Sequence, residues 1–133
     1  MHSHENNITY ENVDTYVLEN IPWFSEYYYH HWYDEEDRKI KFVVFWCLTA
    51  FFRDIYEKND MIMVTSIVEE LYKLYIIEDK MLKELILTGF IENLLEEDKE
   101  KMSQLRETLK YPELQKCLDD MYYGWYEMNW KND

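Results

Sequence analysis

Few residues of this sequence have the types and spacing that carry chemistry. Glu26 and His30 lie four residues apart, so on a helix they share one face and offer half of a metal site or an acid–base pair. Di-iron helical bundles repeat a Glu-x-x-His motif on two helices, and this sequence has none. His2 and His4 supply two ligands without a third, which does not make a site. A solvated surface pair is therefore the favoured interpretation of Glu26 and His30.

The sequence motifs of common catalysts are missing as well. There is no Gly-rich phosphate loop, no Cys/His metal spacing and no Gly-x-Ser-x-Gly. Carboxylates are abundant, but an acid–base dyad needs two of them in different environments. Cys47 and Cys117 fall in apolar helical stripes, which favours two buried thiols in a reducing cytoplasm over a disulfide. We therefore expect a cytoplasmic protein that is not an enzyme and has no metal or cofactor.

The charge of the chain indicates the kind of partner. Twenty-eight acidic and 14 basic residues give a net charge of −14, and residues 1–37 hold nine of the acids and no Lys or Arg. Nucleic acid and anionic membranes repel such a surface, whereas basic proteins are attracted to it. Aromatic residues make up 18% of the chain, and Tyr and Trp are enriched where proteins bind proteins. The composition predicts a protein–protein interaction without nucleic acid or membrane.

The longest apolar run, FVVFWCLTAFF at residues 42–52, is expected to organise the fold. At helical spacing it is apolar nearly all round, which is typical of a helix buried on more than one side. It is too short to span a bilayer, which needs about 20 apolar residues. We predict a central helix over residues 35–58, with Asp34 as its N-cap and Asp34 to Asp37 complementing the helix dipole.

The other helices follow from apolar stripes and capping residues. Two Gly and two Pro are very few, which favours long helices with short connections. Beyond a frayed tail at residues 1–9, a short helix is predicted from a cap at Asn12 or Asp14 to about Asn20. Further helices are predicted near 22–33, 61–77, 80–95 and 102–109, and from Pro112 onward. We predict an all-α single domain, 1–133, of five to seven helices around 35–58. HEAT-like stacking of helix pairs is preferred to a closed four-helix bundle.

The same stripes predict the core. Gly89 lies inside a helix, where it costs about 1 kcal/mol relative to Ala, so we expect another helix to approach it closely. The side chains expected to be buried are Phe45, Trp46, Leu71, Leu85, Phe90, Leu118 and Trp125.

Two regions combine acids with aromatic residues and are candidates for the partner-binding surface. One is residues 26–37, where three consecutive Tyr point in three directions on a helix, so that not all can be core. The other is the final helix. The candidate residues are Glu26, Tyr27, Tyr28, Asp34, Glu35, Glu36, Asp37, Asp119, Asp120, Tyr123 and Tyr126. The first region is favoured because it lies within residues 1–37, which carry −9 of the net charge; the alternative is that Asp34 to Asp37 only cap the central helix.

Residues 67–97, IVEELYKLYIIEDKMLKELILTGFIENLLEE, resemble a small all-helical bacterial family of acidic proteins. That family joins a helix, an acidic turn and a second helix with a Thr-Gly-Phe-(Leu/Ile)-Glu-x-Leu core, which here runs from Thr88 to Leu94. The final helix, YPELQKCLDDMYYGWYEMNW, resembles the family's ending, with a proline near its start and a Trp near the C-terminus. The resemblance covers about half of the chain. Family members are similar to immunity proteins of polymorphic and contact-dependent toxin systems.

The resemblance implies a cytoplasmic antidote that binds a cognate toxin domain, and it transfers no catalytic residue. An acidic, aromatic surface that covers the basic active site of a nuclease is the first hypothesis, because nuclease domains are basic and attract acidic inhibitors. An acidic nucleic-acid mimic that inhibits a defence nuclease is the second. A helical interaction module with another partner is the third.

Overall fold

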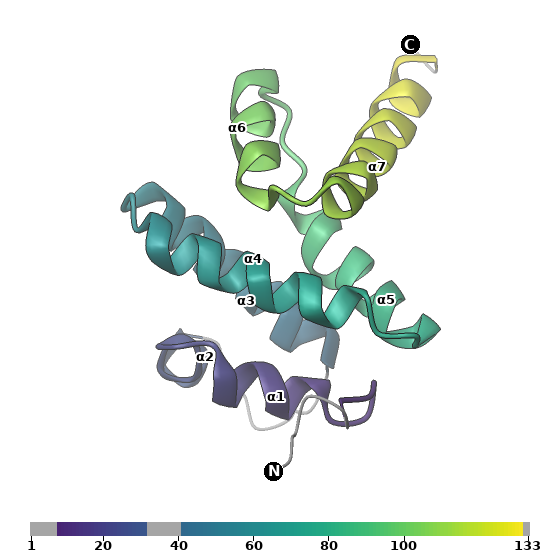
Figure 1. Ribbon diagram of the computed structural model, residues 1–133. Helices are drawn as coiled ribbons and strands as arrows, with labels where there is room; N and C mark the ends of the chain where they lie inside the picture. The colour runs from purple at the N-terminus through teal and green to yellow at the C-terminus, as the bar shows by residue number, and fades with distance from the viewer. Residues whose placement is uncertain (1–7, 32–40, 132–133) are drawn as a thin grey trace.

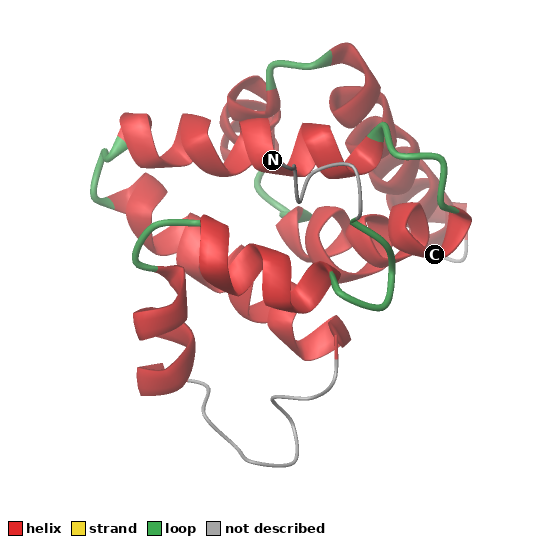
Figure 2. Cartoon of the chain, turned by 60° about the horizontal axis from the view of Figure 1, so that its bottom comes forward, coloured by secondary structure: helices red, strands yellow, loops and turns green. Residues whose placement is uncertain are grey.

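The computed structural model describes residues 8–31 and 41–131, with side chains up to Gly124 except that of His31. The described chain consists of helices joined by loops and turns and contains no strand, which confirms the prediction of an all-α fold (Figure 2). Its α-helices are α1 (Val13–Asn20), α2 (Phe24–His31), α3 (Lys41–Glu57), α4 (Met61–Tyr75), α5 (Lys80–Ile86), α6 (Lys99–Leu109) and α7 (Pro112–Lys131).

The helices form three tiers with α3 at their centre. In Figure 1, α1 and α2 lie on one side of the α3–α4 pair, and α6 and α7 diverge from each other on the opposite side. Helix α3 packs against α1, α2, α4 and α5, so the predicted central role of this helix is confirmed. Residues 35–40 and the proposed cap Asp34 lie outside the described residues. HEAT-like stacking of the helix pairs stays a prediction.

Helix α3 is buried along most of its length, as its apolar pattern requires. Phe45 and Phe52 are fully buried, and the Phe52 ring meets that of Phe90 edge-on, with 5.4 Å between centroids. The burial predicted for Trp46 is wrong, since its side chain is 46% exposed. Phe42 is exposed too, and its ring lies 6.3 Å from that of Trp46, one turn along the helix. An apolar stripe does not show whether neighbours are large enough to cover it, and indole is rarely buried completely.

The remaining core predictions are largely correct. Leu71, Leu85, Phe90 and Leu118 are buried, while the side chain of Trp125 lies outside the described part. Asp60 caps α4 by accepting a hydrogen bond from the Met63 backbone N–H (3.2 Å). Asp79 caps α5 in the same way from Leu82 (3.1 Å), so both connections end at the positions that the capping pattern predicts.

The predicted helix 80–95 is interrupted at Gly89. After α5 the chain widens into a π-helical turn, η3 (Leu87–Ile91), and then tightens into a 3₁₀ turn, η4 (Glu92–Leu94). A Cβ atom at Gly89 would lie 2.7 Å from the Phe45 Cβ, which confirms the expected close approach of another helix, α3. Thr49 donates to the carbonyl oxygens of Phe45 and Gly89 (3.1 and 3.3 Å), so the irregular backbone has hydrogen-bond partners inside the core.

Two glycine substitutions with opposite expected effects on the free energy of unfolding test this contact. Gly89→Ala forces two Cβ atoms together, and overpacking of this kind costs about 1–3 kcal/mol in the free energy of unfolding. Gly124→Ala, within α7, meets no described atom within 4 Å and should stabilise the protein by about 0.5–1 kcal/mol. Urea denaturation followed by circular dichroism measures both. Equal effects of the two substitutions would contradict a steric role for Gly89.

Candidate partner-binding surface

A turn before α2 and the outer face of α2 form the candidate surface. Ile21 is buried and ends α1, and its carbonyl accepts a hydrogen bond from the Phe24 N–H (3.2 Å), which closes the turn. Phe24 and Tyr28 lie four residues apart and are both fully buried, so they fix the inner face of α2. Glu26 and His30 are exposed on the opposite side, as the surface-pair interpretation expects.

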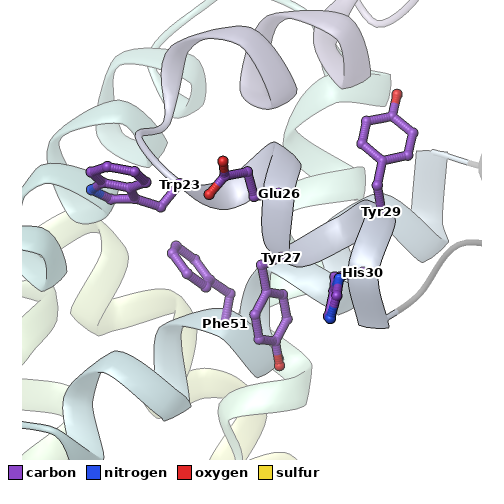
Figure 3. A pocket seen from close by; sticks show the side chains of 6 residues that line it. All are labelled: Trp23, Glu26, Tyr27, Tyr29, His30 and Phe51. Atoms are coloured by element: carbon purple, nitrogen blue, oxygen red, sulfur yellow. The ribbon is translucent and has the colours of Figure 1, made fainter.

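The side chains between this turn and α3 surround an open hollow of about 540 Å³ (Figure 3). Its described lining residues are Trp23, Glu26, Tyr27, Tyr29, His30 and Phe51. The Tyr27 ring packs on the Phe51 ring with 5.0 Å between centroids, and its hydroxyl donates to Asp54 (2.9 Å). In Figure 3 the Glu26 carboxylate points to the side on which Trp23 lies, whereas Tyr29 points away from the others.

Trp23 combines exposure with an unfavourable backbone conformation. Its side chain is 67% exposed, and its φ angle is 68°, in the left-handed region. For a bulky L-residue this conformation costs roughly 1–2 kcal/mol. Strained residues of this kind cluster at binding sites. No hydrogen bond, ring contact or ion pair within the described residues engages either the Trp23 indole or the Glu26 carboxylate.

The candidates in residues 26–37 have three different outcomes. Glu26 is exposed and Tyr27 is half-buried at the hollow, so both belong to this surface. Tyr28 does not, because it is fully buried with its ring 6.2 Å from that of Phe24. The spacing of four that pairs it with Phe24 directs it into the core. Asp34, Glu35, Glu36 and Asp37 lie outside the described residues.

In the final helix, the chain's own basic residues already pair the candidate carboxylates. Arg106 donates two hydrogen bonds to Asp119 (2.7 and 2.9 Å), an arrangement that raises the pKa of Arg106. Lys116 pairs with Asp120 at 2.9 Å. Tyr123 is 65% exposed, and the side chain of Tyr126 lies outside the described part. Figure 1 shows α7 and α2 on opposite sides of the α3–α4 pair, so the two candidate regions do not form one surface.

Residues of α4 and of the turn between α6 and α7 meet in a cluster that the sequence did not predict. The Tyr72 and Tyr111 rings are stacked in parallel with 3.8 Å between centroids. Glu69 pairs with Lys110 (2.6 Å) and accepts a hydrogen bond from the Tyr111 hydroxyl; these two partners hold the pKa of Glu69 below its usual range. The cluster fastens α4 to the turn between α6 and α7. Its side chains are engaged with one another, which indicates a structural role.

Neither cysteine has the environment of a nucleophile. Cys47 is buried, and burial raises the pKa of its thiol to about 12, which keeps the thiol protonated. Cys117 is half-buried rather than buried as predicted, and its thiol donates to the Tyr75 hydroxyl (3.3 Å). Both thiols are free of disulfide bonds. Among the described residues no group of three or more His, Cys, Asp or Glu side chains gathers in a way that suits a metal ion.

Residues 15–126 match the family described as "Domain of unknown function (DUF7674)". The chain belongs to this family. The match spans the sequence from α1 to α7 and includes both the hollow and the Gly89 contact. Comparison with curated proteins and with solved structures gave no match. Within the described residues, no helix has the length and apolar character needed to cross a bilayer.

Trp23 lies outside the region 26–37 that the sequence favoured, and its left-handed conformation gives a test of backbone strain. Trp23→Gly should be more stable than Trp23→Ala by about 1 kcal/mol, because both lose the ring and only Gly accepts the left-handed conformation without penalty. At Glu26, inside α2, the order should reverse by about the same amount, since Gly is the poorer helix former. Chemical denaturation of the four variants measures this. The same order at both positions would contradict the strain at Trp23.

Proposed function

We propose that this protein is an immunity protein that binds and neutralises a cognate bacterial toxin domain in the cytoplasm. Binding covers the active site of the toxin, for which a basic nuclease is the proposed class. The observation that carries the proposal is the hollow at α2, where an exposed, conformationally strained Trp23 stands beside the Glu26 carboxylate, which has no ion pair among the described residues.

The chemistry of the hollow suits a protein partner with a positive surface. Exposed Trp and Tyr rings are the side chains that most often dominate binding energy at protein interfaces. The hollow lies in the part of the chain where residues 1–37 carry nine acids and no Lys or Arg. Such a field accelerates association with a basic domain, and the rings then supply contact area. Binding of this kind needs no catalytic residue and no cofactor.

The distribution of ion pairs favours this proposal over a nucleic-acid mimic. A mimic needs rows of free carboxylates that stand in for successive phosphates. Several carboxylates in the second half of the chain are instead held by basic side chains, as in Arg106–Asp119 and Arg53–Glu96. A helical interaction module with another basic partner is the second candidate, and the same hollow would serve it.

Co-expression with the toxin domain encoded next to this protein's gene tests the proposal. The expected result is a stable complex in size-exclusion chromatography with light scattering, together with rescue of cell growth. Purified protein should also inhibit the isolated toxin domain in a stoichiometric manner. A toxin domain that stays separate and fully active in the presence of excess protein would overturn the proposed function.

Charge reversal at the hollow predicts a specific kinetic effect. Glu26→Lys should slow association with the basic toxin domain about threefold to tenfold at low salt, because electrostatic steering raises the association rate. The difference should shrink at high ionic strength, where charges are screened. Glu107→Lys on α6 is the matched control, since it makes the same change in net charge at an exposed site. Equal slowing by both variants would show that net charge, and not this surface, controls association.

A further inference from the structure

We infer that the hollow at α2 is a receptor for one cationic side chain of the basic partner, with arginine preferred to lysine. The cation would lie against the Trp23 indole and pair with the Glu26 carboxylate. This inference rests on the proposed function, in that the partner is a basic protein, and it assigns the group of that partner that is recognised.

At two other places in the molecule, an aromatic ring and a carboxylate together hold a cation. The Lys41 ammonium lies 5.4 Å from the centroid of the Tyr10 ring and 3.4 Å from the carboxylate of Asp14. The Lys110 ammonium lies 5.5 Å from the centroid of the Tyr111 ring and 2.6 Å from a carboxylate oxygen of Glu69. In both, an aromatic ring and a carboxylate hold one lysine from the chain itself, as expected for a cation–π contact combined with an ion pair.

The hollow has the ring and the carboxylate without the cation. Its described lining contains four aromatic residues, one carboxylate and His30, and no Lys or Arg. The Glu26 carboxylate has no hydrogen bond or ion pair among the described residues, and the Trp23 ring has no ring contact there. An aromatic face and a carboxylate that stay unmatched within the described chain fit a cation supplied by another molecule.

Arginine suits this geometry better than lysine. A guanidinium group is planar, so it can stack on the large indole face of Trp23 while its N–H fork reaches the two oxygens of Glu26. An ammonium group is a more strongly hydrated point charge and makes less contact with a flat ring. The volume of about 540 Å³ and the open shape leave room for a long side chain to enter from solvent.

Short peptides supply the probe. Capped tri-arginine, tri-lysine and tri-citrulline peptides are titrated into the ¹⁵N-labelled full-length protein, and NMR shifts of the Trp23 indole N–H and of the α2 amides are followed. Tri-arginine should give saturable shifts confined to this region and bind about threefold more tightly than tri-lysine. Tri-citrulline, which has the shape of arginine without its charge, should give no saturable shift.

Variants separate the hollow from the general acidity of the surface. Trp23→Leu and Glu26→Gln should each weaken tri-arginine binding about fivefold, read from the α2 amides. The matched controls Trp46→Leu, at another exposed Trp, and Glu107→Gln, at another exposed acid, should leave the affinity unchanged. Equal affinity of tri-arginine for the wild type and for Trp23→Leu would overturn the inference, as would shifts spread over all acidic helices.

The inference and the proposed function can fail separately. A toxin domain that binds Trp23→Leu as tightly as the wild type overturns the inference and leaves the immunity function standing. Saturable tri-arginine binding in the hollow, without any complex with the toxin domain, supports the inference and overturns the proposed function.

Discussion

The close approach of Gly89 to α3 is the constraint on which the second half of the fold depends. Because Gly89 has no side chain, the backbone of η3 lies directly against Phe45, at the point where the regular helix that begins at Lys80 has widened into a π-helical turn. The carbonyl of Gly89 then accepts hydrogen bonds from Thr49 on α3 and from Asn93 (3.3 and 2.9 Å). Helix α7 packs against η3 and η4, so this contact also sets the position of the last helix.

Local signals in the sequence predicted the helices well, and they failed where packing decides. Asp60 and Asp79 mark the starts of α4 and α5 because each cap needs only its own neighbouring backbone. The π-helical turn after Ile86 coincides with a close approach to Phe45, which lies far away in the sequence, so only the presence of Gly89 indicated a close contact. Trp46 was placed inside because it continues an apolar stripe, and a stripe carries no information on what covers it.

For the candidate surface, too, local signals were informative and contacts between helices were not predictable. Composition indicated that the N-terminal part is acidic and aromatic, and Glu26 and Tyr27 do lie at one hollow. Residue type alone could not separate Tyr27 from Tyr28, whose positions differ by one step of helix rotation. The sequence also could not show that Phe51, from α3, completes the hollow, or that Arg106 pairs with Asp119. These facts depend on which helices become neighbours.

The buried residues on either side of Trp23 explain how its backbone can keep a strained conformation beneath an exposed ring. Ile21 and Phe24, on either side of the turn, are buried, and the Tyr27 N–H donates to the Trp23 carbonyl (3.1 Å), so the backbone at Trp23 is fixed from both sides. Burial of these neighbours offsets the strain of roughly 1–2 kcal/mol. A backbone fixed before binding loses no freedom of its own when the proposed partner arrives, so only the rotation of the Trp23 side chain is restricted. Under the proposed function, the strain at Trp23 is the cost of presenting this side chain to a partner from a fixed backbone.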